Sequence, residues 1–351
     1  MTDDSVASTQ ALAETWGMIG HARAVTALAR AVERDAISHA YLISGPRSVG
    51  KSTLTRRLTQ ALLCERSLEE RPCGVCSACR RVEQGKHPDI DIWSLARQVA
   101  EGGKEARLTG LSIETARRIS ASVSLRPFEG RWRVVVVENA ETLTIPAQQA
   151  MLKTLEEPTG FTVFVVLAAE PDAMLETIRS RCQQLSLQLV PTLVIAEALA
   201  GRGAQPASAN ELASLSRGRP GWALAAASDP QVAADERERM HAAERWVRAT
   251  PLDRQIRAYQ TGDRFTKARS AVIDEVQATE VVWRDLLLAA AGLPEVASDP
   301  DRGDRAWATL TLSQAHAALA ATRLGISDLR ANVRPRLALQ AMVSSWPTLS
   351  S

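Results

Sequence analysis

A glycine-bounded loop near the start of the chain carries the residue types that hold a polyphosphate. It follows the pattern Gly-x-x-x-x-Gly-Lys-Ser, and the predicted nucleotide-binding residues are Gly45, Pro46, Arg47, Ser48, Val49, Gly50, Lys51, Ser52 and Thr53. Glycines permit backbone angles at which successive amide N–H groups turn inward around phosphate oxygens. Lys51 adds a mobile positive charge, and Ser52 offers a hydroxyl to a nucleotide-bound Mg²⁺. The loop therefore predicts a site for ATP or ADP with Mg²⁺.

The residues on either side of the loop predict the strand and the helix that such a site needs. Residues 40–44 form an apolar run before the loop, and Leu54, Leu58 and Leu62 repeat at helical spacing after it. A helix that begins near Lys51 directs the positive end of its dipole toward the phosphates. This context disfavours the alternative interpretation, in which a glycine-rich turn matches the pattern by chance.

Four of the five cysteines lie close together in the sequence. They are Cys64, Cys73, Cys76 and Cys79, and the last three have the spacing Cys-x-x-Cys-x-x-Cys. This spacing lets thiolates converge on one ion, and we predict a structural Zn²⁺ because four protein ligands leave no open position for chemistry. The alternatives are an iron–sulfur cluster, which suits the same spacing, and unliganded thiols. Cys182 is not expected to take part.

The groups that activate water in phosphate-loop ATPases are missing. The β-branched run 134–137 predicts a central strand buried on both faces. An Asp that helps to hold Mg²⁺ and a Glu that activates water usually follow this strand, but these positions read Glu138 and Asn139. An amide cannot take a proton from water. The strand predicted over 161–168 ends at Ala168, where a Thr or Asn would position water. The sequence predicts nucleotide binding without hydrolysis.

Composition narrows the wider class of protein. The chain has 351 residues, which predicts two or three domains. Lys and Arg number 42 against 40 Asp and Glu, so the net charge of +2 gives no overall bias toward nucleic acid or membrane. The sequence contains no run of about 18 apolar residues, which is the length that could span a bilayer. The acidic, polar start does not resemble a secretory signal, so we expect a cytoplasmic protein without disulfides or a membrane partner.

Alternating predicted strands and helices favour a doubly wound α/β domain that extends to about residue 189. Between its strands, the polar segment 98–109 is expected to be a surface loop. From residue 231 onward the pattern is helical, with a linker at 228–230. The expected helices cover 236–249, 265–291, 304–321 and 327–343. Core positions are expected for four tryptophans, Trp246, Trp283, Trp307 and Trp346.

Several motifs together resemble one protein family. They are the phosphate loop, the cysteine cluster, Lys-Thr-Leu-Glu-Glu-Pro at 153–158 and Ser-Arg-Cys at 180–182. In combination they are similar to the bacterial clamp-loader subunits of DNA polymerase III, which belong to the AAA+ class. The resemblance covers about residues 15–228, and beyond them it rests mainly on 332–340.

Three departures from the motor subunits (tau/gamma) resemble the δ′ (delta prime) subunits of this family. Asn139 replaces the water-activating glutamate, Ala168 ends the strand that would carry a sensor residue, and Gly221 stands where a motor would carry a sensor arginine. The stretch 218–224 is also similar to δ′ sequences.

The resemblance implies the fold class, α/β followed by α. An AAA+ phosphate-loop domain with a parallel sheet and flanking helices is expected over 1–189, with a four-cysteine zinc module at 64–79. A small helical lid is expected over 190–228. An all-α collar domain, through which subunits join in a ring, is expected over 231–351.

The resemblance also implies the function, a δ′ subunit that helps to load the sliding clamp on primed DNA. The implied partners are the tau/gamma and delta subunits, the clamp and the DNA. Such a chain is an accessory subunit of a DNA-directed DNA polymerase without ATPase activity of its own. The alternative is an ATP-hydrolysing motor subunit of tau/gamma type, or another AAA+ ATPase that remodels nucleic acids.

Arg181 lies in the Ser-Arg-Cys motif, which in the family stands at the subunit edge. The resemblance implies that its guanidinium acts catalytically in trans, on ATP bound by a neighbouring motor subunit. A local role is the alternative, in which Arg181 caps its helix or pairs with a nearby carboxylate.

Overall fold

The structure is a computed structural model of the chain that describes residues 15–102, 110–157, 159–298, 310–331 and 333–348. The chain divides into two compact units, residues 1–224 and 225–351. In the described ranges, no helix has the length and apolar character required to cross a membrane.

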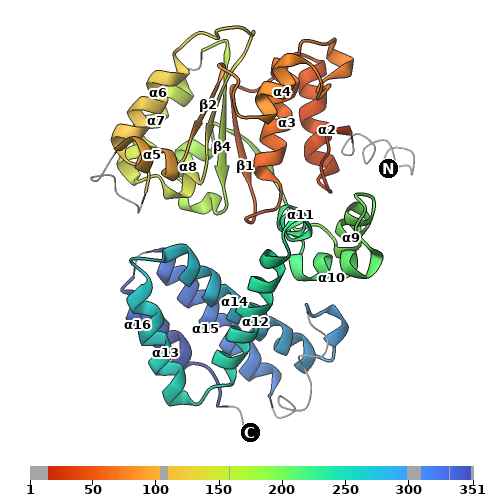
Figure 1. The fold of residues 1–351 in the computed structure, drawn as a ribbon. Coiled ribbons are helices and arrows are strands. Elements are labelled where there is room, and N and C mark those ends of the chain that lie inside the picture. The colour runs from red at the N-terminus through yellow and green to blue at the C-terminus, as the bar shows by residue number, and fades with distance from the viewer. Residues whose placement is uncertain (1–14, 103–109, 158, 299–309, 332, 349–351) are drawn as a thin grey trace. The chain divides into compact units, whose positions relative to one another are not determined.

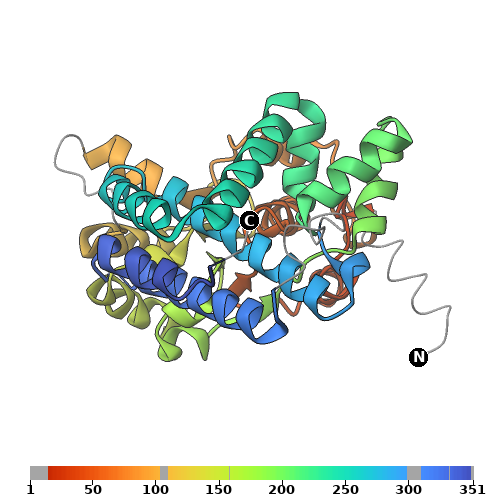
Figure 2. The ribbon, with the colours of Figure 1, turned by 90° about the horizontal axis from the view of Figure 1, so that it is seen from below.

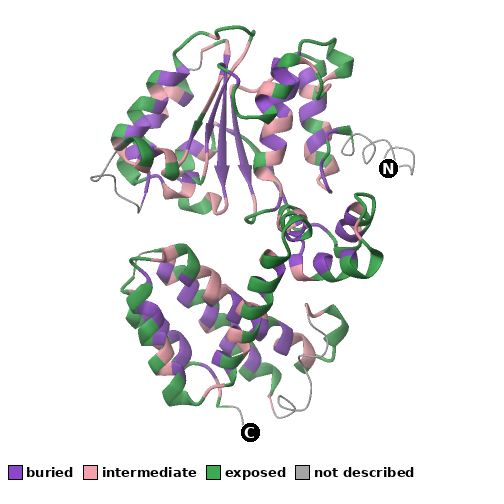
Figure 3. Cartoon of the chain, viewed as in Figure 1, coloured by how far each residue is buried: buried purple, intermediate pink, exposed green. Residues whose placement is uncertain are grey.

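A five-stranded parallel sheet forms the centre of the first unit (Figure 1). Its strands are β1 (Ala40–Ser44), β2 (Ile90–Trp93), β3 (Arg133–Val137), β4 (Thr162–Ala168) and β5 (Gln183–Ser186). The spatial order is β2-β3-β4-β1-β5. The apolar strands β1, β3 and β4 are buried along most of their length (Figure 3), because helices cover both faces of the sheet. The predicted doubly wound α/β domain is confirmed.

Two layers of helices cover the sheet. In chain order the helices are α2 (Ala22–Glu33), α3 (Lys51–Leu63), α4 (Ser77–Glu83), α5 (Leu95–Gly102), α6 (Ile113–Val123), α7 (Ile145–Glu156) and α8 (Glu176–Arg179), with short 3₁₀ turns η1 (Leu68–Glu70), η3 (Ala140–Thr142) and η4 (Pro171–Ala173). Helices α2 and α3 pack with Tyr41 and Ile43 on one face, and α6 and α7 pack with Ala40 and Leu42 on the other (Figure 1). Successive residues of β1 thus face opposite layers, as strand geometry requires.

The register of the strands fixes which loops meet. Ser44 at the end of β1 lies opposite Ala168 at the end of β4, and Val137 at the end of β3 lies opposite Val166. Since the strands are parallel, the segments that follow β1, β3 and β4 emerge at one edge of the sheet. This edge holds the phosphate loop.

Two parts of this unit differ from the expectation. Strand β5 is not among the predicted strands, because it is short and polar and only Leu185 is buried in it. Helix α5 covers the start of the segment that we expected to be a surface loop, residues 98–109. Gln98 is buried there because its side chain donates to Gly110 O and accepts from Ser112 N, both at 2.9 Å. Residues 103–109 of that segment lie outside the described residues.

Three further helices complete the first unit and lead out of it. They are α9 (Thr192–Ala200), α10 (Pro206–Ser216) and α11 (Pro220–Ser228). Helices α9 and α10 pack against each other, and the division between the two units falls within α11. A separate lid over 190–228 remains a prediction.

The second unit is helical throughout its described residues. Its helices are α12 (Pro230–Arg248), α13 (Pro251–Arg264), α14 (Arg269–Ala290), α15 (Leu312–Arg330) and α16 (Pro335–Ser344), with a short turn η5 (Pro294–Val296). Helices α14 and α15 pack side by side, and α13 packs against α16 (Figures 1 and 2).

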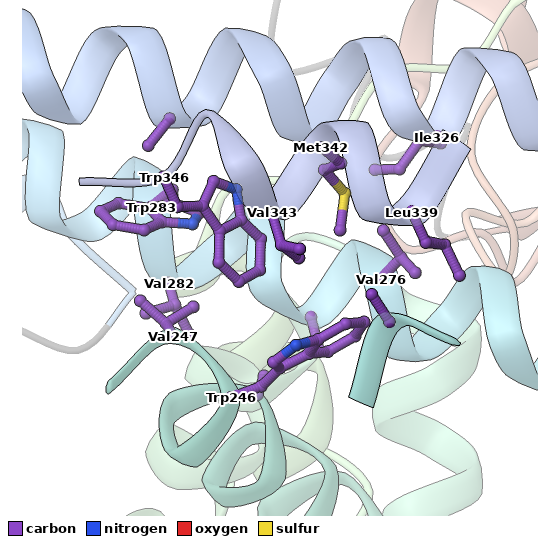
Figure 4. Close-up of a cluster of buried hydrophobic side chains, with 14 of the residues drawn as sticks. Trp246, Val247, Val276, Val282, Trp283, Ile326, Leu339, Met342, Val343 and Trp346 are labelled. Atoms are coloured by element: carbon purple, nitrogen blue, oxygen red, sulfur yellow. The ribbon is translucent and has the colours of Figure 1, made fainter. Parts of the chain in front are cut away.

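Three tryptophans lie in the hydrophobic core of the second unit (Figure 4). The ring centroid of Trp346 lies 5.8 Å from that of Trp246 and 5.6 Å from that of Trp283, in edge-to-face geometry. The expected core positions are confirmed for these three residues. Trp307 lies outside the described residues.

Helix boundaries in the second unit differ from the expectation. Helix α13 is not among the predicted helices, since its sequence is polar and only one face is buried. We expected a helix over 304–321, but the described part begins at Leu312 and continues to Arg330, because Gly325 packs closely against Met342. The expected helix over 327–343 is instead divided, and Pro335 stands in the first turn of α16. Residues 304–309, Pro158 and Asn332 lie outside the described residues.

Candidate functional site

The phosphate loop joins β1 to α3 in the predicted order of strand, loop and helix. Gly45 and Gly50 have φ angles of 144° and 119°, and Ser48 has φ of 59°. A side chain at Gly45 is also excluded by packing, because its Cβ would lie 2.3 Å from the Leu187 carbonyl oxygen. The backbone of the loop therefore has the turns that direct amide groups inward.

Lys51 lies over this loop at the first turn of α3. Its Nζ donates to Gly45 O at 2.6 Å and to Pro46 O at 2.9 Å. Burial lowers the pKa of Lys51, and the negative charge of Glu141 partly opposes this effect. Phosphate oxygens would compete with the two carbonyls for the ammonium group, and Ser52 stands exposed beside it.

His21 supports the loop from the side. Its Nε2 lies 2.9 Å from Val49 O, and because a carbonyl only accepts, Nε2 carries the proton. Burial lowers the pKa of His21, and the hydrogen bond to Val49 opposes this effect. The ring therefore contacts the loop backbone, immediately before α2.

The positions predicted to lack water-activating groups lie at the ends of β3 and β4. Asn139 has φ of 51°, and its carbonyl accepts from the Thr142 amide at 2.9 Å and from the Thr142 hydroxyl at 2.7 Å. Asn139 thus forms the turn after β3 and leaves an amide at the position of the missing glutamate. Ala168, opposite Ser44, is fully buried and offers no polar side chain.

Glu141 has a place at this edge that the sequence analysis missed. Its Oε2 accepts from the Ala169 amide at 3.2 Å, and the neighbouring Ala168 carbonyl accepts from the Gly45 amide at 3.2 Å. The carboxylate is therefore connected through one peptide to the first residue of the loop. The available signal was an acidic residue one 3₁₀ turn beyond a strand end, a position to which the sequence motifs assign no role.

Gly221 brings α11 into contact with the loop. Its amide donates to Ser48 O at 2.8 Å, and a Cβ at this position would lie 2.8 Å from the same oxygen. Any side chain here would move the loop or the helix. This packing disfavours a side chain at the position where the resemblance implies a sensor arginine in motor subunits.

The four clustered cysteines converge as predicted. Their Sγ atoms lie within 4.8 Å of one another, and the Cys64–Cys76 and Cys73–Cys79 sulfur atoms are each 4.0 Å apart. Four sulfurs at about 2.3 Å from a tetrahedral zinc would lie about 3.8 Å apart. The Cys76 amide donates to Cys73 Sγ at 3.3 Å, and the Cys79 amide donates to Cys76 Sγ at 3.4 Å. The residues present fit a zinc ion.

The cysteine cluster is attached to the end of the phosphate-loop helix. Cys64 directly follows α3, and Gln60 of α3 donates through Nε2 to Cys79 O at 3.0 Å. Burial raises the pKa of Cys79. Burial also opposes ionisation of Cys73, but amide hydrogen bonds outweigh it and lower the pKa of Cys73 to about 6. Cys182 lies apart, in the core on the α6 and α7 face of the sheet.

Arg181 lies between α8 and β5. Its guanidinium pairs with Glu156 Oε1 at 2.7 Å and donates to Thr177 O at 2.9 Å. Both local roles that the sequence left open, pairing with a carboxylate and capping a helix, are thus present in this chain. Arg181 keeps about a third of its side chain exposed, and a guanidinium has five N–H donors.

Comparisons with known proteins match the part of the chain that contains this site. Residues 20–191 match the family described as DNA polymerase III, delta subunit. The chain is 35% identical over 188 residues to the DNA polymerase III tau subunit of Escherichia coli, covering 52% of this chain and 27% of tau. It is also 35% identical over 191 residues to the delta′ subunit of Pseudomonas aeruginosa, covering 52% and 54%. The chain therefore spans between about a quarter and a half of the length of these relatives.

A solved structure, of a DNA polymerase III gamma subunit-related protein of Thermotoga maritima, is similar over 91% of this chain and 97% of its own, with 18% identity and a TM-score of 0.40. Over residues 20–191, the first unit is thus similar to clamp-loader subunits of DNA polymerase III. The tau and delta′ relatives named above both match at 35% identity.

Proposed function

We propose that this chain is a δ′-type subunit of the DNA polymerase III clamp loader. In this role it joins tau/gamma and delta subunits and helps to load the sliding clamp on primed DNA. One observation supports δ′ over a motor subunit: Asn139, Ala168 and Gly221 replace the hydrolytic groups. The intact phosphate loop and Lys51 are the features that a motor subunit would share. Gly221 is the strongest of the three, since a side chain there would meet Ser48 O.

The proposed nucleotide role is binding without turnover. Loop amides, Lys51 and Ser52 would hold the phosphates of ATP or ADP, and Glu138 with Ser52 would face Mg²⁺. A bound nucleotide would supply charge that orders the loop and α11. Hydrolysis needs groups that act only when water attacks, and those positions carry an amide and a methyl group.

Zinc is proposed to act as a structural ion. Four thiolate ligands fill a tetrahedral site, so the metal would fix residues 64–79 against the end of α3 without taking part in chemistry.

The proposed chemical contribution is made by Arg181 in a neighbour's site. A guanidinium remains protonated and offers planar donors to the oxygens of a transferring phosphoryl group. To act in trans it must exchange Glu156 for the neighbour's phosphate. The pair is partly exposed, so its loss costs about 0–1 kcal/mol and does not prevent the exchange.

Reconstitution tests this proposal. The Arg181→Ala variant should assemble with tau/gamma and delta, yet depress clamp-stimulated and DNA-stimulated ATP hydrolysis and clamp loading. Arginine fingers are worth roughly 10³- to 10⁵-fold, and we expect a smaller loss because other sites in the ring still fire. Arg181→Lys should be nearly as defective, since it has charge but no planar fork.

Glu156→Gln is the matched control, because it removes the local partner and leaves the arginine. We expect wild-type ATP hydrolysis or faster. Wild-type loading by the Arg181→Ala complex would make Arg181 a structural residue. Failure of the chain to join the subunits at all would overturn the δ′ assignment.

A further inference from the structure

The groups around the phosphate loop are unevenly distributed along the path of a polyphosphate. The loop amides reach the inner phosphates, and Lys51 at the start of α3 reaches the second phosphate and, in a triphosphate, the third. Beyond them, Ala168 at the end of β4 carries no polar side chain, and Gly221 in the first turn of α11 carries none at all. Neither position offers a third phosphate a hydrogen bond or a positive charge.

The carboxylate of Glu141 lies at the end of β4. It accepts a hydrogen bond from the amide of Ala169, and the carbonyl of Ala168 accepts a hydrogen bond from the amide of Gly45, the first residue of the loop. Its charge acts on Lys51 against the effect of burial, and the charge of Arg47 acts on Lys51 in the opposite sense to Glu141. The loop thus carries two cationic side chains, Arg47 and Lys51, and the anionic side chain of Glu141 lies near it.

We propose that this site selects a nucleoside diphosphate over a triphosphate, and that Glu141 is the residue that disfavours the third phosphate. The inference rests on the proposed nucleotide binding and makes it more specific. A diphosphate is held by the loop amides and Lys51. A triphosphate adds negative charge on the side of the loop where Glu141 already stands, with no new partner from Ala168 or Gly221.

The expected size follows from charge repulsion near a protein surface. Two like charges several ångströms apart at an intermediate dielectric change an equilibrium by about tenfold, and the bound Mg²⁺ reduces the effect. We therefore expect the full chain to bind ADP about tenfold more tightly than ATP.

The experiment measures binding and does not depend on turnover. Isothermal titration of the full-length chain with Mg-ADP and with a non-hydrolysable Mg-ATP analogue gives the ratio of the two dissociation constants. Glu141→Gln should reduce this ratio about fivefold or more by tightening the triphosphate, while ADP binding stays within about twofold. Glu33→Gln removes an equal charge at the last residue of α2, about 18 Å along the helix from His21, and should leave the ratio unchanged.

A second measurement keeps the inference testable if Glu141→Gln does not fold. Raising the salt concentration screens repulsion, so the wild-type ratio should shrink between low and high salt. Equal affinities for ADP and the ATP analogue, or an unchanged ratio in a folded Glu141→Gln variant, would overturn the role of Glu141 while nucleotide binding stands. Binding of neither nucleotide would instead refute the proposed nucleotide role, and the selectivity with it.

Discussion

The two ends of α3 carry candidate sites that are built by different means. At its start, the loop at 45–50 binds through backbone amides, and its geometry depends on positive φ angles. At its end, Cys64 and three further cysteines converge through side chains. The helix has 13 residues, so its ends lie about 18 Å apart. One rigid element thus joins an exchangeable ligand site to a closed one.

If the proposed function holds, this difference explains how a phosphate loop can be retained in a chain that does not hydrolyse nucleotide. A backbone site keeps its donors whatever side chains surround it, so Asn139 and Ala168 change the chemistry without removing the binding groups. A thiolate site depends on its side chains, because each of the four cysteines supplies one of the four metal ligands. Binding and turnover are therefore separable at one end of α3, while ligand and fold are inseparable at the other.

The largest expected effect is the loss of the metal site formed by the four cysteines at the end of α3. Cys79→Ser should abolish the zinc that elemental analysis finds in the wild-type chain, lower the melting temperature and expose residues 64–79 to proteolysis, because metal binding and local folding are coupled. Cys182→Ser, which removes another buried thiol, should retain zinc. Iron in the wild-type protein, or no metal under reducing conditions, would contradict the prediction.

The next largest effect is weaker nucleotide binding at the phosphate loop, without any change at the cysteine cluster. Lys51→Ala should weaken ADP binding by about 10- to 100-fold in a fluorescent-nucleotide titration, because hydrogen bonds to charged groups are worth about 1.5–3 kcal/mol. Zinc content should not change. Steady ATP hydrolysis by the isolated wild-type chain, abolished by Lys51→Ala, would favour the motor-subunit alternative.

A smaller effect sharpens the role of α11 at the loop. Gly221→Ala should destabilise the first unit by about 1–3 kcal/mol in urea unfolding, since its Cβ would press on Ser48 O. Gly160→Ala is the control, because a Cβ there meets nothing within 4 Å. Equal stability of both variants would show that α11 yields easily.

The smallest effect concerns pH at the loop. The pKa of His21 lies below its ordinary value because of burial, so the unfolded chain binds a proton first as the pH falls. The stability contributed by neutral His21 is present above about pH 6.5 and is lost below it. His21→Gln should flatten this part of the pH dependence of the melting temperature. A change at alkaline pH only would contradict this sign.

The sequence predicted those parts of the fold whose conformation is determined by the local residue types. The β-branched run of β3 and the glycines of the loop each determine their own conformation, and the cysteine spacing led to a real cluster. Strand β5 and helix α13 were missed because their residues are mostly polar, and pairing with β1 or packing against α16 creates these elements. Such tertiary effects leave little trace in a local pattern.

The candidate site shows the same limit. The pattern identified the loop and the absent glutamate at Asn139. It did not reveal Glu141, whose carboxylate accepts from the amide of Ala169, just after β4. Nor did it reveal that Arg181 pairs with Glu156, since the two residues come from different elements. Contacts between distant segments were needed for both.

The contact between Gly221 and Ser48 has an evolutionary consequence. A chain that regained a glutamate at Asn139 would still lack the sensor arginine, and an arginine at 221 would strain the loop before it could assist catalysis. Gain of a side chain at 221 would therefore require a compensating change in the loop or in α11, so the two segments would have to change together.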